Sequence, residues 1–126
     1  MNGESDGGAT RTVTVYGLAN CDTCRKARKW LASEGVAHRF HDVRADGLDP
    51  AALDAWIAAV GWEVLLNRRG TTWRGLPAAE TAGIDGPRAR DLMLRHPALV
   101  KRPVFDTAGR IIVGFGPKEQ AALRAG

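Results

Sequence analysis

The segment Val13–Leu31, VTVYGLANCDTCRKARKWL, changes its periodicity halfway along, and this change constrains the fold more than any other feature of the chain. β-Branched residues alternate over residues 12–16, as they do in a buried strand. From Asp22 onward the apolar residues recur at helical spacing instead. Cys21 lies at the turn between these two patterns, and Cys24 lies on the apolar stripe of the expected helix. The chain therefore begins with a strand, a cysteine-bearing turn and a helix.

The remaining patterns predict the order of the later elements. These are a strand in VAHRFHDV, a helix from Asp49 and Pro50 to Gly61, a block of short helical turns, a helix in DGPRARDLMLRHPAL closed by Pro97, a hairpin across Thr107–Gly109, and a terminal helix in GPKEQAALRAG. A βαβ unit thus opens the chain and a ββα unit closes it. This order predicts an α/β, thioredoxin-like fold with a mixed sheet and about sixty helical residues inserted between the halves.

Length and composition place the chain among ordinary globular proteins. The 126 residues suffice for one domain, which we expect over residues 12–126. Residues 1–11, MNGESDGGATR, have the composition of a disordered extension. Neither a signal peptide nor a membrane-spanning apolar run is evident, so we expect no membrane association and a cytoplasmic location. A purely structural disulfide is not expected in that compartment.

The net charge of +4 raises the question of a polyanionic partner. The cations are spread along the chain, however, and no aromatic ladder of the RNA-binding kind accompanies them. We therefore do not expect nucleic-acid binding. An anionic small molecule fits this charge distribution at least as well.

Zinc is one possible use of the two cysteines, because Cys21-x2-Cys24 is followed by His38-x2-His41. A zinc finger places its cysteines on a hairpin and its histidines on the following helix. Here the helix follows the cysteines, and the histidines lie in an alternating strand that points them to opposite faces. We therefore expect no metal site.

Thiol chemistry is the second possibility. Cys21 lies where free backbone N–H groups and the helix dipole favour an anion, which lowers the pKa of a thiol. Cys24 is three residues further on, and both sulfurs then lie on one side of the helix. As a small buried side chain Cys24 could also serve only for packing. Four cations follow directly, at Arg25, Lys26, Arg28 and Lys29, and they suit either an arriving anion or a solvated helix face.

Five segments carry a resemblance to a known family. They are YGLANCDTCRKARKWL, RFHDVRADGL, GWEVLLNRRGTTWRGL, HPALVKRPV and VGF, and they run in order from Val13 to Ala122. With these segments the chain resembles the ArsC/Spx family of thioredoxin-fold proteins. It is most similar to the YffB-like branch of arsenate-reductase-related proteins.

The resemblance implies roles for individual residues. Cys21 is expected to be the nucleophile, Arg102 an anion-contacting arginine beside it, and Pro103 the cis-proline of thioredoxin-type folds. Arsenate reductases proper carry an arginine directly after the "LL" of the middle block, where this chain has Asn67 followed by Arg68. They carry a further arginine near the end of the last strand, where this chain has "VGF".

Two functions follow from the resemblance. One is a glutathione-dependent thiol reductase that acts on a small thiol or disulfide, with catalytic residues Cys21 and Cys24 and a substrate-binding set of Arg102, Arg68, Asn67 and Pro103. The other is a redox-sensing regulator that binds RNA polymerase through a Cys21/Cys24 switch. A homologue with little activity is a third alternative. We expect a monomer without a bound cofactor, with glutathione as co-substrate.

Overall fold

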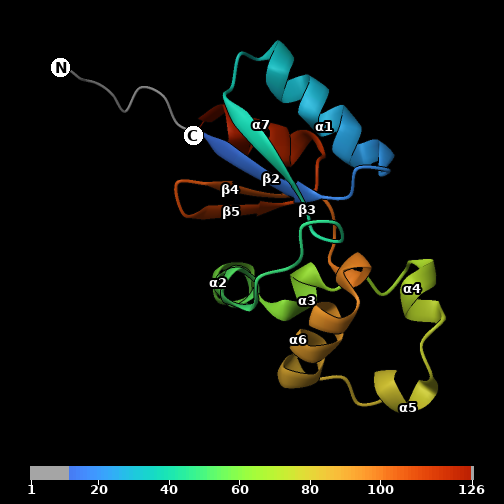
Figure 1. Ribbon diagram of the computed structural model, residues 1–126. Coiled ribbons are helices and arrows are strands. Elements are labelled where there is room, and N and C mark those ends of the chain that lie inside the picture. The colour runs from blue at the N-terminus through green and yellow to red at the C-terminus, as the bar shows by residue number, and fades with distance from the viewer. Residues whose placement is uncertain (1–11, 126) are drawn as a thin grey trace. The chain divides into compact units, whose positions relative to one another are not determined.

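The computed structural model describes residues 12–125 (Figure 1). The predicted disordered extension at residues 1–11 lies outside the described residues. The described chain forms two compact units, of which one contains the residues up to Asp42 and from Arg102 onward, and the other is Val43–Lys101. The expectation of a single domain from residue 12 stays a prediction.

The first unit is built on a four-stranded mixed sheet. Its elements are β2 (Val13–Gly17), α1 (Asp22–Ser33), β3 (His38–Asp42), β4 (Val104–Thr107), β5 (Arg110–Val113) and α7 (Pro117–Ala125). The strand order is β3-β2-β4-β5. β2 runs parallel to β3 and antiparallel to β4, and β4 pairs antiparallel with β5. The predicted α/β, thioredoxin-like arrangement of βαβ followed by ββα is confirmed.

One face of this sheet carries the core of the first unit. Val13 and Val15 are buried while the residues between them are partly exposed, as the alternating sequence predicts. The core cluster combines side chains of the sheet with side chains of α1 and α7, namely Val13, Val15, Ala27, Leu31, Phe105, Ile112 and Leu123. Since both helices share a cluster with the same strand residues, α1 and α7 pack on the same face of the sheet (Figure 1).

Local sequence signals determine where these elements end. Gly35 has a φ of +71° and follows the last turn of α1, a backbone conformation that favours glycine. The β4–β5 hairpin turns through Ala108 and Gly109, which both have positive φ. At the start of α7, the Glu119 carboxylate accepts a 2.7 Å hydrogen bond from the Gly116 backbone N–H, as the acidic residue of a capping box does.

The second unit is the helical insertion that the sequence predicts. It contains α2 (Pro50–Val60), α3 (Trp62–Leu65), α4 (Thr71–Arg74), α5 (Ala78–Thr81), α6 (Gly86–Arg95) and the 3-10 turn η2 (Pro97–Leu99). Asp49 caps α2 by accepting a 3.1 Å hydrogen bond from the Ala51 N–H. α6 ends before Pro97 because the residue that precedes a proline is forced out of the helical conformation, here His96.

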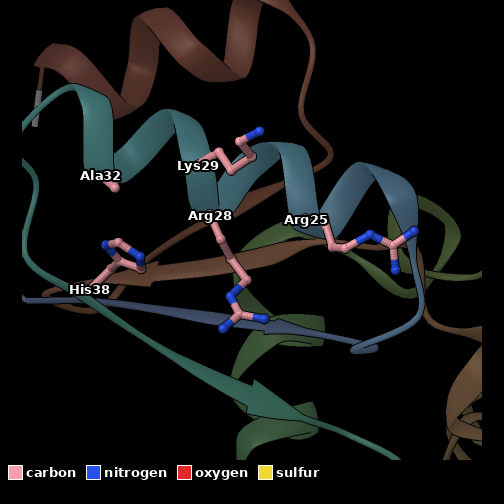
Figure 2. Close-up of a pocket in the computed structure, with 5 residues that line it drawn as sticks. All are labelled: Arg25, Arg28, Lys29, Ala32 and His38. Atoms are coloured by element: carbon pink, nitrogen blue, oxygen red, sulfur yellow. The ribbon is translucent and has the colours of Figure 1, made fainter.

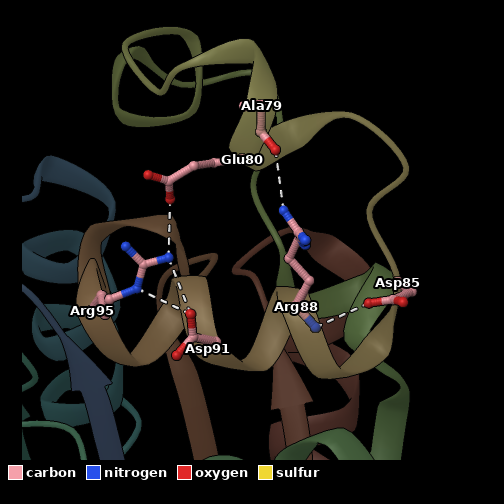
Figure 3. Close-up of polar contacts among 6 residues, drawn as sticks. All are labelled: Ala79, Glu80, Asp85, Arg88, Asp91 and Arg95. Carbon is pink, nitrogen blue, oxygen red and sulfur yellow. Dashed lines mark hydrogen bonds and ion pairs between the residues drawn. The ribbon is translucent and has the colours of Figure 1, made fainter.

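Two arginines hold α5 to α6, as Figure 3 shows. Arg95 bridges Glu80 of α5, at 2.9 Å, and Asp91 of its own helix, at 3.0 Å. Arg88 donates to the backbone oxygen of Ala79 at 3.1 Å. Neither α4 nor α5 contributes a buried side chain. These short helices are therefore held mainly by polar contacts, which makes them candidates for local opening.

None of the helices within residues 12–125 combines the length and the apolar composition that crossing a lipid bilayer requires.

Candidate active site

The two cysteines lie at the start of α1, in the first unit. Cys21 is the N-cap residue, with an extended backbone, and it is half-buried. Its N–H donates to the Leu18 backbone oxygen at 3.1 Å, and its own carbonyl accepts from the Arg25 N–H at 3.0 Å. Cys24 lies one turn further on and is completely buried. Both thiols are free.

The turn that presents Cys21 is anchored to the end of β3. The Asp42 carboxylate accepts a 2.9 Å hydrogen bond from the Ala19 N–H. The Ala19 carbonyl in turn accepts from the Arg25 guanidinium at 3.2 Å, and Arg25 also pairs with Asp22. The turn is thus held from the neighbouring strand and from the first turn of its own helix.

Arg102 and Pro103 bring the beginning of β4 to the same place. The peptide bond between them is cis, as predicted from the family resemblance, and Pro103 is buried. The Gly114 N–H donates to the Pro103 carbonyl at 2.9 Å, which fixes this segment to the end of β5. The Arg102 guanidinium is close enough to the Cys21 thiol to lower its pKa. The structure therefore brings Cys21, Cys24, Arg102 and Pro103 together.

The pKa of Cys21 is lowered from the ordinary value of a thiol. Partial burial acts in the opposite direction and is the largest single influence. It is outweighed by the backbone N–H and the thiol of Cys24, and by the hydrogen bond and charge of Arg102. The other N–H groups of the first turn of α1 favour the Cys21 thiolate through their dipoles.

The pKa of Cys24 is shifted the other way, to about 11. Burial is the main cause, and the neighbouring Cys21 raises the pKa further. The Cys24 sulfur packs directly on Gly17, where a Cβ atom would overlap it. Cys24 therefore stays a neutral thiol at physiological pH, while Cys21 is the thiol that ionises.

Asn67 and Arg68 belong to the second unit. There they line a pocket of about 330 Å³ together with Glu63, Leu66, Arg69 and Lys101. Backbone hydrogen bonds of 2.8 Å, from Asn67 N–H to Leu99 and from Lys101 N–H to Leu65, join the two sides of this pocket. The Asn67 side chain accepts from the Arg69 N–H at 3.0 Å, which makes a local turn. The Arg68 guanidinium lies over the Trp62 ring, 5.6 Å from its centre.

Gly114 and Phe115 lie where arsenate reductases proper carry their last arginine, and Phe115 packs against other aromatic side chains. The Phe115 ring contacts the Trp30 ring edge-on, with ring centres 5.6 Å apart. The centres of the Phe115 and Phe105 rings are 6.2 Å apart. Phe115 is therefore part of the core of the first unit, next to Gly114. The segment offers no cation to an anionic ligand.

The histidines lie on opposite faces of β3, as the alternating pattern predicts. His38 bonds the Val36 backbone oxygen at 2.9 Å, whereas His41 stacks on Tyr16 with ring centres 5.1 Å apart. Within residues 12–125 no three His, Cys, Asp or Glu side chains are close enough to hold a metal ion.

Sequence reasoning missed two residues of the site, Gly17 and Asp42. A signal for both was present, because they end the first two strands and pair with each other in the parallel register. The carboxyl ends of parallel strands meet at one edge of a sheet, which is where ligand sites of such folds form. Asp42 accordingly holds the Cys21 turn, and Gly17 makes room for Cys24.

A four-stranded mixed sheet with a cysteine at the N-terminus of its first helix, and a cis-proline directly before β4, is the arrangement of thioredoxin-fold proteins. A sequence model of the ArsC family matches residues 16–123. The chain therefore belongs to the ArsC family.

Individual relatives agree with this assignment. An uncharacterized protein of Haemophilus influenzae is 43% identical over 113 residues, which cover 90% of this chain and 99% of that protein. The global transcriptional regulator Spx of Streptococcus pyogenes serotype M6 is 28% identical over 114 residues, covering 88% of this chain and 84% of the regulator. The chain is thus similar both to an uncharacterized protein and to a protein named as a transcriptional regulator.

Two solved structures share both fold and sequence with the chain. A YFFB protein is 46% identical with a TM-score of 0.83, covering 87% of this chain and 96% of that chain. An arsenate reductase (ArsC) related protein from Brucella melitensis is also 46% identical, with a TM-score of 0.75, covering 92% and 97%. The family resemblance found in the sequence is confirmed.

Proposed function

We propose that this protein is a thiol-dependent reductase in which the Cys21 thiolate is the nucleophile and glutathione is the co-substrate. The observation that carries the proposal is the opposite shift of the two thiol pKa values, lowered at Cys21 and raised to about 11 at Cys24. A nucleophile needs its thiolate form, and the site favours that form at one cysteine only.

In the first step, the Cys21 thiolate attacks one sulfur of a small disulfide. A Cys21–sulfur bond forms, the substrate S–S bond breaks, and the second half of the substrate leaves as a thiolate that takes a proton from water. Arg102 would favour this step by stabilising the attacking thiolate and the anionic groups of the substrate.

In the second step, a glutathione thiolate attacks the sulfur bound to Cys21 and releases Cys21 as a thiolate. The substrate half then leaves as a mixed disulfide with glutathione, which a second glutathione reduces. Cys24 could resolve the adduct instead, by forming a disulfide with Cys21. Its burial and raised pKa make it the weaker nucleophile, so external glutathione is the preferred resolving thiol.

The remaining residues of the predicted set would serve in binding. Arg102 would hold a carboxylate of glutathione beside Cys21, and Pro103 would present backbone to the bound tripeptide. Arg68 and Asn67, in their own pocket of the second unit with Arg69 and Lys101, would contact an anionic group there. A reducing, glutathione-containing compartment and a monomeric enzyme are part of the same proposal.

A second function is supported by the Spx relatives and by the paired cysteines. In it, a Cys21–Cys24 disulfide would switch the binding of RNA polymerase. The pKa of Cys24, near 11, argues for slow closure of that disulfide at neutral pH, because the thiolate is the reacting form.

The test is steady-state turnover with glutathione and bis(2-hydroxyethyl) disulfide, coupled to glutathione reductase and NADPH consumption. We expect turnover for the wild-type protein, none for Cys21→Ser, and most of the activity for Cys24→Ser. Loss of activity in both variants would assign resolution to Cys24. No turnover in the wild-type protein, together with polymerase retained on an immobilised sample, would favour the regulator.

A further inference from the structure

Three cations of α1 border a groove against β3, and Arg25 among them also holds the turn that presents Cys21. Arg25, Arg28 and Lys29 follow each other at i, i+3 and i+4 along the helix. Together with Ala32 and His38 they line a shallow, open depression of about 390 Å³, and Figure 2 shows these five side chains. All of these residues belong to the first unit.

The groove has a fixed floor. The Arg28 guanidinium lies 4.2 Å from the centre of the Phe40 ring, which holds this cation over β3. The His38 ring is oriented by its 2.9 Å bond to the Val36 carbonyl. His38 and Phe40 are two positions apart in β3, so their side chains lie on the same side of the strand, the side that α1 covers. Part of the groove is therefore already in place before a ligand binds.

The acidic side chains near the groove already have partners, and only Asp22 is paired with a residue of the groove. Asp22 pairs with Arg25, Glu34 pairs with Arg124 at 3.0 Å, and Asp42 accepts from Ala19. Within residues 12–125, no carboxylate lies at ion-pair distance from Arg28 or Lys29. The positive charge of the groove is thus only partly compensated by the described part of the protein.

This arrangement disfavours α1 as an isolated helix. Like charges at i, i+3 and i+4 repel weakly, and Asp22 compensates this only at Arg25. An anion bound beside Arg28 and Lys29 would remove the remaining repulsion.

We propose that this groove binds a small organic phosphate of nucleotide size. Arg28 and Lys29 match the multiple charges of a phosphate chain, and the Arg28 guanidinium can bind phosphate oxygens in two-point contact. Arg25 is paired with Asp22 at the edge of the groove. The volume is that of a small-ligand pocket, and the aliphatic stems of the cations with the Ala32 methyl offer apolar contact to an organic moiety. Phosphate binding by Arg28 and Lys29 does not depend on the reductase chemistry, because the side chains that anchor the Cys21 turn are those of Asp42 and Arg25.

The test is isothermal titration calorimetry of the full chain with magnesium-free adenosine triphosphate, at low and at physiological salt. Exposed single charges contribute modestly, so we expect Lys29→Gln to weaken binding about twofold to fivefold and Arg28→Gln with Lys29→Gln about tenfold. Lys26→Gln is the matched control, since it removes an exposed charge of the same helix outside the groove, and it should change affinity by less than about twofold.

Further ligands test which part of the nucleotide the groove recognises and whether a larger anionic partner binds there instead. Inorganic phosphate should bind more weakly than the triphosphate, and adenosine without phosphate should not bind. If Lys26→Gln weakened triphosphate binding as much as the groove variants do, the affinity would depend on net charge alone, and the proposed site would be wrong. Tighter binding of a single-stranded RNA 12-mer or of anionic lipid vesicles, lost in the same groove variants, would overturn the small ligand as occupant. Lys29 is exposed, so its replacement leaves the core intact and keeps the test valid.

Discussion

Cys21 and Cys24 carry the same side chain, and the opposite shifts of their pKa values come from their different surroundings. Cys21 lies at the first turn of α1, and the positive charge of Arg102 stabilises its thiolate. Cys24 is buried inside the unit, and its sulfur packs against Gly17. Ionisation of one thiol also raises the pKa of the other, because a second negative charge beside the first is unfavourable. The pair therefore holds one thiolate rather than two.

The first prediction concerns Arg102 and the pH dependence of alkylation. The reactive form is the thiolate, and Arg102 favours it, so Arg102→Gln should raise the pKa of Cys21 and move the alkylation midpoint to higher pH. At neutral pH the rate with iodoacetamide should fall about threefold to tenfold. Mass-spectrometric mapping across pH 5–10 measures the midpoint at each cysteine separately.

Lys118→Gln provides the control, because it removes one exposed cation at α7 without touching the thiols. An unchanged midpoint in Arg102→Gln, or labelling of Cys24 before Cys21 in the native protein, would contradict the assignment of the nucleophile.

The second prediction concerns Gly17. A Cβ atom at this position would overlap the Cys24 sulfur, so Gly17→Ala must displace either the strand or the thiol. Overpacking of this kind costs about 1–3 kcal/mol in the free energy of unfolding. Urea denaturation measures the loss, and the accessibility of Cys24 to alkylation should rise in parallel.

A double variant isolates the cause. Cys24→Ala removes the overlapping sulfur, so Gly17→Ala should cost much less in the Cys24→Ala background than in the wild-type protein. Equal costs in both backgrounds would mean that the strand, and not the thiol contact, requires glycine here.

Among the elements, the β4–β5 hairpin has the clearest conflict between sequence and conformation. Ala108 has a φ of +55° and Gly109 a φ of +87°, the combination of a two-residue turn in which both positions are left-handed. Glycine adopts this conformation readily, but alanine does so at a steric cost. The hairpin is therefore formed by its strands in spite of the residue at its turn.

The third prediction follows from this conflict. Ala108→Asn should stabilise the protein by about 0.5–1 kcal/mol, because asparagine tolerates the left-handed region and Asn-Gly is the preferred sequence for this turn. Ala108→Val should destabilise it, since a β-branched residue is disfavoured at positive φ. Chemical denaturation compares the two, and similar values for both variants would refute the steric explanation.

At the scale of the whole molecule, elements could be predicted from the sequence wherever the periodicity is strong. The alternation around Val13 and Val15 and the helical spacing after Asp22 specify the first βα unit to within one residue, since the strand observed is Val13–Gly17. Asp49 and Gly35 mark helix ends through interactions with their immediate neighbours. Signals of this kind act within a few residues and can therefore be read from one chain.

Contacts between segments that are distant in the sequence could not be predicted from these local patterns. The hydrogen bond from Ala19 to Asp42 depends on the parallel pairing of β2 with β3, and the role of Gly17 depends on where the Cys24 thiol packs. Arg102 and Pro103 were identified through family resemblance rather than through their own local pattern. The site could thus be located from the sequence, but its supporting contacts required the fold.

The last prediction concerns arsenate, a substrate suggested by the names of several relatives. Holding a multiply charged oxyanion against a thiolate requires charge-assisted bonds, each contributing about 1.5–3 kcal/mol. This chain keeps Arg102 beside Cys21, but the Asn67 side chain is engaged in a local turn and Phe115 packs against Trp30, at the two positions where resemblance leads to further arginines.

Losing two such contacts costs roughly 3–6 kcal/mol of transition-state binding, or a factor of about 10² to 10⁴ in rate. We therefore expect arsenate reduction that is weak or undetectable, alongside measurable thiol exchange with glutathione. The measurement is steady-state arsenate reduction with glutathione and glutaredoxin supplied, compared with an established arsenate reductase under the same conditions. Turnover within about tenfold of that reference would mean that other cations, Arg68 or Arg69 among them, replace the missing arginines. Thiol exchange without arsenate reduction would indicate that the substrate of this protein is a disulfide. Attack on a disulfide needs only the Cys21 thiolate and one guanidinium, whereas arsenate needs several cations around its oxygens.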